Sequence, residues 1–113
     1  TKQVDVNLVE TFNYLIGLYV KNTYSSNGFK VVEGETRTEE KTLIIWRDLK
    51  EKDNATLDEL VNKLRVNPKD FEFDRIYVNG DNNLENLKLD NETWKVTLIE
   101  EEFKRCMFDV EDV

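Results

Sequence analysis

A run of amide and carboxylate side chains at residues 79–83 (NGDNN) is the part of the sequence best suited to binding a partner through hydrogen bonds. It follows an apolar segment, residues 76–78 (IYV), and such a run bounded by turn formers predicts a buried strand ending in a tight loop. Open α/β sheets usually place binding groups at the carboxyl end of a central strand. We expect this loop to contact a partner domain, or else to satisfy its own backbone as an Asx-type turn. The candidate contact residues of the loop are Asn79, Asp81, Asn82 and Asn83.

Carboxylates are plentiful, so a metal-dependent nuclease has to be considered. Glu39 and Lys41 form a Glu-x-Lys pattern with Glu33 upstream. That pattern is frequent in acidic chains, and these residues lie at a predicted turn instead of at converging strand ends. An acidic segment near the C-terminus offers oxygen ligands for a hard cation, and it consists of Asp109, Glu111 and Asp112. Neither pattern is specific enough to predict a metal site.

Nucleophilic and imidazole chemistry have almost no basis in this sequence. The chain contains no histidine, so His-ligated metals and imidazole catalysis are impossible within it. Cys106 has no histidine base and is followed by Met107 on a predicted helix, which disfavours a nucleophile. The four glycines of the chain are too far apart in the sequence for a phosphate-binding loop. We therefore expect no catalytic and no cofactor-binding residue in this chain.

Composition indicates one globular domain over residues 1–113. Apolar residues make up 39% and charged residues 35%, and the net charge of −8 opposes nonspecific attraction to phosphate. One cysteine excludes an intrachain disulfide and favours a reducing, cytoplasmic setting. No apolar run approaches the roughly 20 residues of a membrane-spanning helix. The chain starts at Thr1 and runs straight into an amphipathic pattern, so we expect it to be a piece of a longer protein.

Hydrophobic periodicity predicts the elements that would position these side chains. Three helices are expected, over residues 6–20, from Asn54 or Thr56 to Pro68, and from residue 100 onward. Residues 20–47 are expected to form an antiparallel meander with an Asn27–Gly28 hairpin and strands over 29–33 and 42–46. Further strands are expected over 73–78 and 94–98, with a short irregular or helical piece near Leu84.

These elements predict an α+β fold with a small mixed sheet of about four to five strands and three helices. The strand over 42–46, the second helix and the strand over 73–78 make one βαβ unit, so those two strands should be parallel. The first helix carries an apolar stripe that includes Phe12 and has Tyr14 beside it. A core helix is the simpler interpretation of this stripe, and Phe12 and Tyr14 are our candidates for contact with a partner.

Several separated stretches together resemble one protein family. They are residues 9–18 (VETFNYLIGL), 45–48 (IWRD), 74–87 (DRIYVNGDNNLENL), 94–96 (WKV) and 99–108 (IEEEFKRCMF). In this order they resemble the C-terminal segment of adenine-specific DNA methyltransferases, the modification subunits of type III restriction–modification systems. The resemblance covers about residues 8–110.

The resemblance implies a parent enzyme that transfers a methyl group from S-adenosylmethionine to adenine N6 in DNA. It also implies a homodimer that assembles with an ATP-dependent restriction (helicase/endonuclease) subunit. The Asp-Pro-Pro-Tyr and Phe-x-Gly-x-Gly motifs of the family are absent here, so no catalytic or cofactor-binding residue is carried over. The fragment itself is expected to need no cofactor.

The sequence and the resemblance leave three functions to be tested. The first is a non-catalytic C-terminal domain that serves dimerisation or subunit assembly, in contact with the rest of the methyltransferase chain. The second is a module that contacts DNA through a basic strip formed by Lys30, Arg37, Lys41 and Arg47. The third is a carboxylate nuclease. The acidity of the chain favours protein contact over a DNA-binding face.

Overall fold

The computed structural model describes residues 5–65 and 71–111, with side chains placed through residue 107. Within these ranges three α-helices, a short 3-10 helix and five strands follow one another along the chain. In order they are α1 (Val6–Leu15), β1 (Tyr19–Ser26), β2 (Phe29–Glu35), β3 (Lys41–Trp46), α2 (Asn54–Leu64), β4 (Arg75–Val78), η2 (Leu84–Leu87), β5 (Lys95–Leu98) and α3 (Ile99–Glu111).

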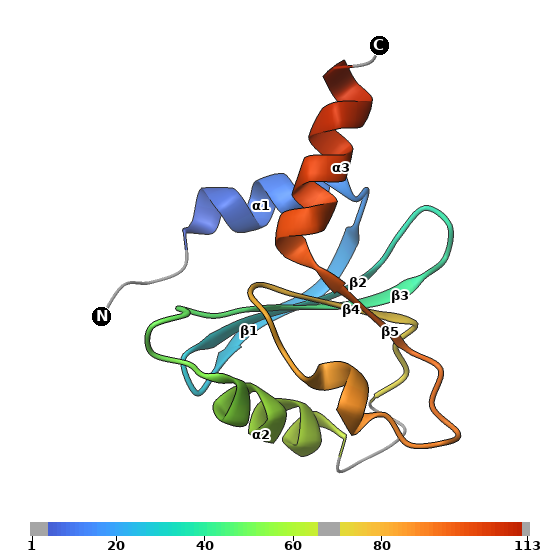
Figure 1. The fold of residues 1–113 in the computed structure, drawn as a ribbon. Coiled ribbons are helices and arrows are strands. Elements are labelled where there is room, and N and C mark those ends of the chain that lie inside the picture. The colour runs from blue at the N-terminus through green and yellow to red at the C-terminus, as the bar shows by residue number, and fades with distance from the viewer. Residues whose placement is uncertain (1–4, 66–70, 112–113) are drawn as a thin grey trace.

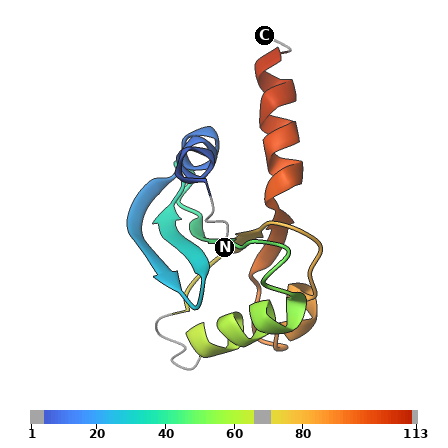
Figure 2. The same ribbon diagram turned by 90° about the vertical axis from the view of Figure 1, so that its left-hand side faces the viewer.

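The strands form one mixed sheet in the order β1-β2-β3-β4-β5 (Figure 1). The first three strands are antiparallel, and β3, β4 and β5 run parallel to one another. The predicted α+β fold and the predicted parallel pairing across the βαβ unit are both confirmed. Helices α1 and α3 lie on one face of the sheet, and α2 with η2 lies on the other (Figures 1 and 2).

Each face of the sheet has its own apolar core because side chains alternate between the two faces of every strand. Leu43 and Ile45 of β3 point to the α2 side, where they join a cluster with residues such as Leu57. Ile44 and Trp46 point to the opposite side, toward α1 and α3. Strand β3 is buried over residues 42–46, so its continuous apolar run is covered on both faces of the sheet.

Helix α1 ends earlier than the periodicity predicted. It stops at Leu15, because Gly17 adopts a positive φ of 66°. The N–H of Gly17 donates to the carbonyl of Tyr14, and the N–H of Leu18 donates to the carbonyl of Asn13. These two bonds form a Schellman motif, in which glycine takes the left-handed position that a side chain disfavours. The apolar residues that follow therefore belong to β1 instead of to the helix.

The turn and cap signals give a mixed outcome. Asn27 and Gly28 both have positive φ and connect β1 to β2, as the hairpin prediction requires. Asp53 caps α2, since its carboxylate accepts from the N–H and hydroxyl of Thr56 at 2.9 and 2.6 Å. The helix therefore begins at Asn54, the first of the two predicted starts. Several neighbouring residues here can cap a helix, and periodicity cannot choose among them.

The remaining predictions concern the C-terminal half. A short 3-10 helix lies where a helical or irregular piece was expected, and β5 adds a strand parallel to β4. Pro68 and the side chains of the acidic C-terminal segment lie outside the described residues. In the described part of the chain, no helix is long and apolar enough to cross a bilayer.

Candidate interaction surface

The loop after β4 is held by a buried arginine. Arg47 is 4% exposed, and its guanidinium donates to the carbonyls of Asn79, Asp81 and Lys52 at 3.0, 3.0 and 3.3 Å. It also donates to Oδ1 of Asn54 at 2.9 Å. Burial lowers the pKa of Arg47, but the guanidinium stays charged and its fork satisfies several carbonyls at once. Arg47 therefore joins β3, the start of α2 and the loop.

The polar side chains of the loop fall into two groups. Asn79 bonds the backbone of Arg47 through both Oδ1 and Nδ2, and Asn82 bonds the carbonyl of Gly80 and the N–H of Leu84. Asn82 thus satisfies the backbone of its own loop, as the Asx-type alternative predicted, whereas Asn79 bonds the distant backbone at the end of β3. The side chains of Asp81 and Asn83 are exposed at the tip of the loop. Glu100 of α3 accepts the N–H of Gly80 at 2.9 Å and ties the loop to the last helix.

Of the carboxylates that suggested a nuclease, Glu33 lies on β2 and Glu39 lies in the turn between β2 and β3. Glu33 accepts from the hydroxyl of Tyr24 at 3.0 Å, and burial together with this bond raises the pKa of Tyr24 to about 12. Glu40 accepts from Arg75 at 2.9 Å, while Lys41 lies 3.6 Å from Glu72. No group of three or more Cys, Asp or Glu side chains suited to a metal ion is found in residues 5–65 and 71–107.

The candidate residues Phe12 and Tyr14 lie in opposite environments, although two positions apart. Phe12 is fully buried, and its ring meets the rings of Trp46, Tyr77 and Phe103 with centroid separations of 5.8, 5.2 and 5.2 Å. Tyr14 is 81% exposed on the outer side of α1. Phe12 therefore anchors the helix to the sheet, and Tyr14 is the one available for contact.

Tyr14 belongs to a larger exposed surface formed by α1 and β1. Tyr19 is 69% exposed and Val20 47% exposed, and the burial pattern of β1 shows that most of its side chains face solvent. We call this the α1–β1 surface. The name covers the exposed residues Tyr14, Tyr19, Val20, Asn22, Thr23 and Ser25, of which Val20, Thr23 and Ser25 face the groove beside α1. Sequence reasoning named only Tyr14 of this set.

None of the residues of the α1–β1 surface is itself a carboxylate, although β2 places Glu33 and Glu35 opposite Asn22 and Tyr19. The chain has 24 Asp and Glu residues, yet none occurs between Glu10 and Glu33. The only charged side chains in that stretch are Lys21 and Lys30, and Lys21 lies 3.7 Å from Glu35. This stretch of sequence, with its exposed tyrosines, therefore differs from the rest of a chain whose net charge is −8. This gap in the acidic residues is visible in the sequence and is the signal that would have marked the surface.

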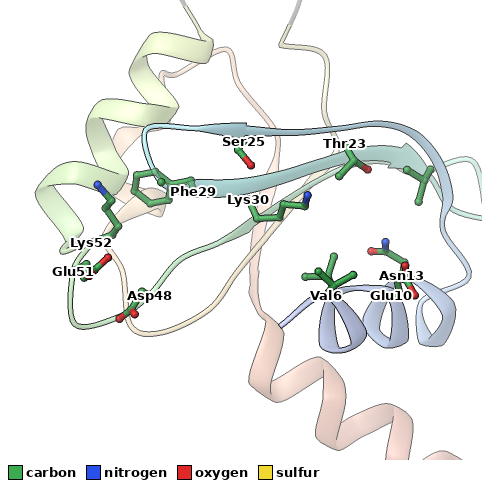
Figure 3. A pocket seen from close by; sticks show the side chains of 13 residues that line it. Val6, Glu10, Asn13, Thr23, Ser25, Phe29, Lys30, Asp48, Glu51 and Lys52 are labelled. Carbon is green, nitrogen blue, oxygen red and sulfur yellow. The ribbon is translucent and has the colours of Figure 1, made fainter. Parts of the chain in front are cut away.

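A groove of about 710 Å³ lies beside this surface, between α1 and the β1–β2 hairpin (Figure 3). Val6 and Asn13 line it from the helix, and Thr23 and Ser25 line it from β1. Its rim carries both signs of charge, with Glu51 and Lys52 adjacent to each other. The groove offers apolar area and hydrogen-bonding groups without a concentrated charge, which is chemistry suited to binding and not to catalysis.

Cys106 lies in the interior. It is 8% exposed, and its Sγ is 3.9 Å from the carbonyl of Leu15. The next residue, Met107, is 55% exposed. The α3 residues that pack toward the sheet are Ile99, Phe103 and Cys106. The thiol thus lies where α3 contacts the end of α1.

Comparisons of the chain with protein-family models, with curated proteins and with solved structures each found no significant match.

Proposed function

We propose that this chain is a non-catalytic C-terminal domain of a DNA adenine-N6 methyltransferase of a restriction–modification system, and that it joins protein chains. It serves dimerisation or subunit assembly of the parent enzyme. In this role the methyl group, the S-adenosylmethionine and the target base are handled by the rest of the methyltransferase chain. The restriction subunit is the further partner that the resemblance implies.

The observation that carries the proposal is the α1–β1 surface. Tyrosine is enriched at protein interfaces, because its ring supplies apolar area and its hydroxyl remains able to hydrogen-bond. Charged residues are depleted at the centre of such interfaces. Exposed Tyr14 and Tyr19, together with a stretch from which all carboxylates are missing, fit both tendencies.

Direct DNA contact is the alternative, and the positions of the basic residues weigh against it. Of the four residues in the predicted basic strip, Arg47 is buried and its guanidinium donates to backbone carbonyls. Lys41 is close to Glu72. Binding to the phosphate backbone depends on several exposed cations acting together, and a buried arginine cannot take part. Steeply salt-dependent binding of a duplex by this chain would favour the alternative.

Two measurements test the proposal. Sedimentation equilibrium of the purified chain over a concentration series detects self-association, and a pull-down with the rest of the parent methyltransferase chain or the restriction subunit detects assembly. We expect at least one of these associations with a dissociation constant well below about 1 mM. A chain that stays monomeric and binds neither protein would refute the proposal. A methyltransferase assay on the isolated chain should give no product, and turnover there would also refute it.

A further inference from the structure

We propose that β1 pairs with β1 of a second copy of this chain, antiparallel and about a two-fold axis at Tyr24, so that the two five-stranded sheets become one. This inference rests on the proposed role in chain assembly and specifies the partner and the register. Strand β1 is the outermost strand on its side of the sheet (Figure 2). An edge strand presents unpaired N–H and C=O groups that can bond to another strand.

The turn that precedes β2 determines which backbone groups face outward. Asn27 and Gly28, with φ of 50° and 85°, make a two-residue turn of type I′, which closes on a hydrogen-bonded pair between Ser26 and Phe29. Bonded and non-bonded pairs alternate along an antiparallel ladder. Ser25–Lys30 and Thr23–Val32 are therefore non-bonded pairs.

It follows that the N–H and C=O groups of Thr23 and Ser25 point away from β2, toward the open edge. This part of the strand is regular, because the irregularity in β1 lies nearer its start, between Val20 and Asn22. Neither residue is proline, so both outward N–H groups are present to donate. The edge from Asn22 to Ser26 is thus a regular, unpaired template for another strand.

The sequence of this edge is complementary to itself in one register. A two-fold axis at Tyr24 sets Thr23 opposite Ser25 of the second copy, and Ser25 opposite its Thr23. Both outward-facing residues are then in hydrogen-bonded pairs, with their side chains on the α1 side of the sheet. The two Tyr24 rings meet on the α2 side, where an aromatic cross-strand pair is favourable.

The charges along β1 allow a second copy to approach, because β1 carries no carboxylate and those opposite it on β2 are paired, Glu33 with Tyr24 and Glu35 with Lys21. Two bodies with a net charge of −8 repel each other, so they approach most easily where carboxylates are missing. The β1 edge lies inside the stretch between Glu10 and Glu33 that contains none. The regular part of the edge, residues 22–26, has no charged side chain, so no like charges stand directly opposite in the proposed register. Like charges directly opposite would destabilise the pairing.

Hydrogen exchange of the backbone amides of the wild-type chain tests this pairing without any substitution. We expect the Thr23 and Ser25 amides to exchange roughly tenfold or more slowly at concentrations where the chain is dimeric than at concentrations where it is monomeric. The Tyr24 amide already bonds to β2 within one copy and serves as the internal control, with a much smaller change. A dimer in which the Thr23 and Ser25 amides exchange as they do in the monomer overturns the pairing and leaves the proposed function standing.

A proline variant gives an independent test of the same contact. Thr23→Pro removes the outward N–H but no bond to β2, and proline is tolerated at such edge positions. The matched control Thr23→Val keeps the N–H and the β-branched shape. We expect the proline variant to weaken self-association at least tenfold, with circular dichroism unchanged, and the valine variant to associate like the wild type. Equal association by both variants overturns the pairing, as does a chain that is monomeric yet binds the rest of the parent enzyme.

Discussion

Arg47 and Asn79 hold each other through reciprocal hydrogen bonds between the ends of neighbouring strands. The N–H of Arg47 donates to Oδ1 of Asn79 at 3.0 Å, and Nδ2 of Asn79 donates back to the carbonyl of Arg47 at 2.8 Å. The guanidinium of Arg47 then donates to the carbonyl of Asn79 at 3.0 Å. The C-terminal ends of β3 and β4 are thereby joined. The conformation of the loop after β4 depends on Arg47, which lies 32 positions before Asn79 in the sequence.

Asn79→Ala should lower the free energy of unfolding by about 2 kcal/mol, because it leaves a backbone N–H and a carbonyl without their partners in a partly buried position. Asn83→Ala is the control. Asn83 is exposed and its side chain makes no capping bond to η2, so its loss should change stability by less than about 0.5 kcal/mol. Urea denaturation of the two variants measures the difference. Equal effects would show that the amide of Asn79 does not hold the loop.

Gly34→Ala should destabilise the sheet by roughly 1–3 kcal/mol. A Cβ at this position would lie 2.3 Å from the carbonyl oxygen of Tyr19 and 2.9 Å from the side chain of Leu18. The oxygen belongs to the backbone of β1, so β1 itself has to move. Thermal unfolding followed by circular dichroism measures the loss, and a melting temperature equal to that of the wild type would show that β1 is not packed this closely on β2.

Stability should fall as the solution becomes acidic, in part through Glu102. The hydrogen bond from Arg105 is the main cause that lowers the pKa of Glu102 below its usual value. Because the folded state favours the carboxylate, its stabilisation is present above about pH 5 and is lost as the pH falls through the lowered pKa of Glu102. Glu102→Gln should cost about 1 kcal/mol at neutral pH. The variant should also lose less stability than the wild type between about pH 6 and 3. Parallel pH profiles of the two proteins would contradict this role.

Much of the fold could be predicted from the sequence because its local signals agree with the tertiary structure. The Asn27–Gly28 turn, the apolar run of β3 and the βαβ unit were all predicted correctly. The end of α1 was not predicted correctly, although glycine is the residue type that typically follows a helix and Gly17 occupies that position. The apolar stripe continued past Gly17, and periodicity alone cannot distinguish the last turn of a helix from the start of a strand.

The candidate surface was harder to predict because its character depends on long-range contacts. A charged residue such as Arg47 is expected at the surface, and only the fold shows that carbonyls from a distant loop surround it. Phe12 and Tyr14 share one helix, and the position of the sheet decides which of them is buried. The absence of carboxylates between Glu10 and Glu33 is readable from the sequence. Only the fold shows that this stretch contains an edge strand, β1, with backbone groups open to a partner.

The most direct test of the central claim is a comparison of chain association between the wild type and the double variant Tyr14→Ser/Tyr19→Ser, measured by sedimentation equilibrium. Both side chains are exposed, so their loss should change stability by less than about 0.5 kcal/mol per site. Leu89→Ser removes a comparably exposed apolar side chain outside the α1–β1 surface and is the matched control. We predict that the double variant associates at least tenfold more weakly, while the control matches the wild type. Unchanged association of a folded double variant would contradict the claim that this domain joins chains through its α1–β1 surface.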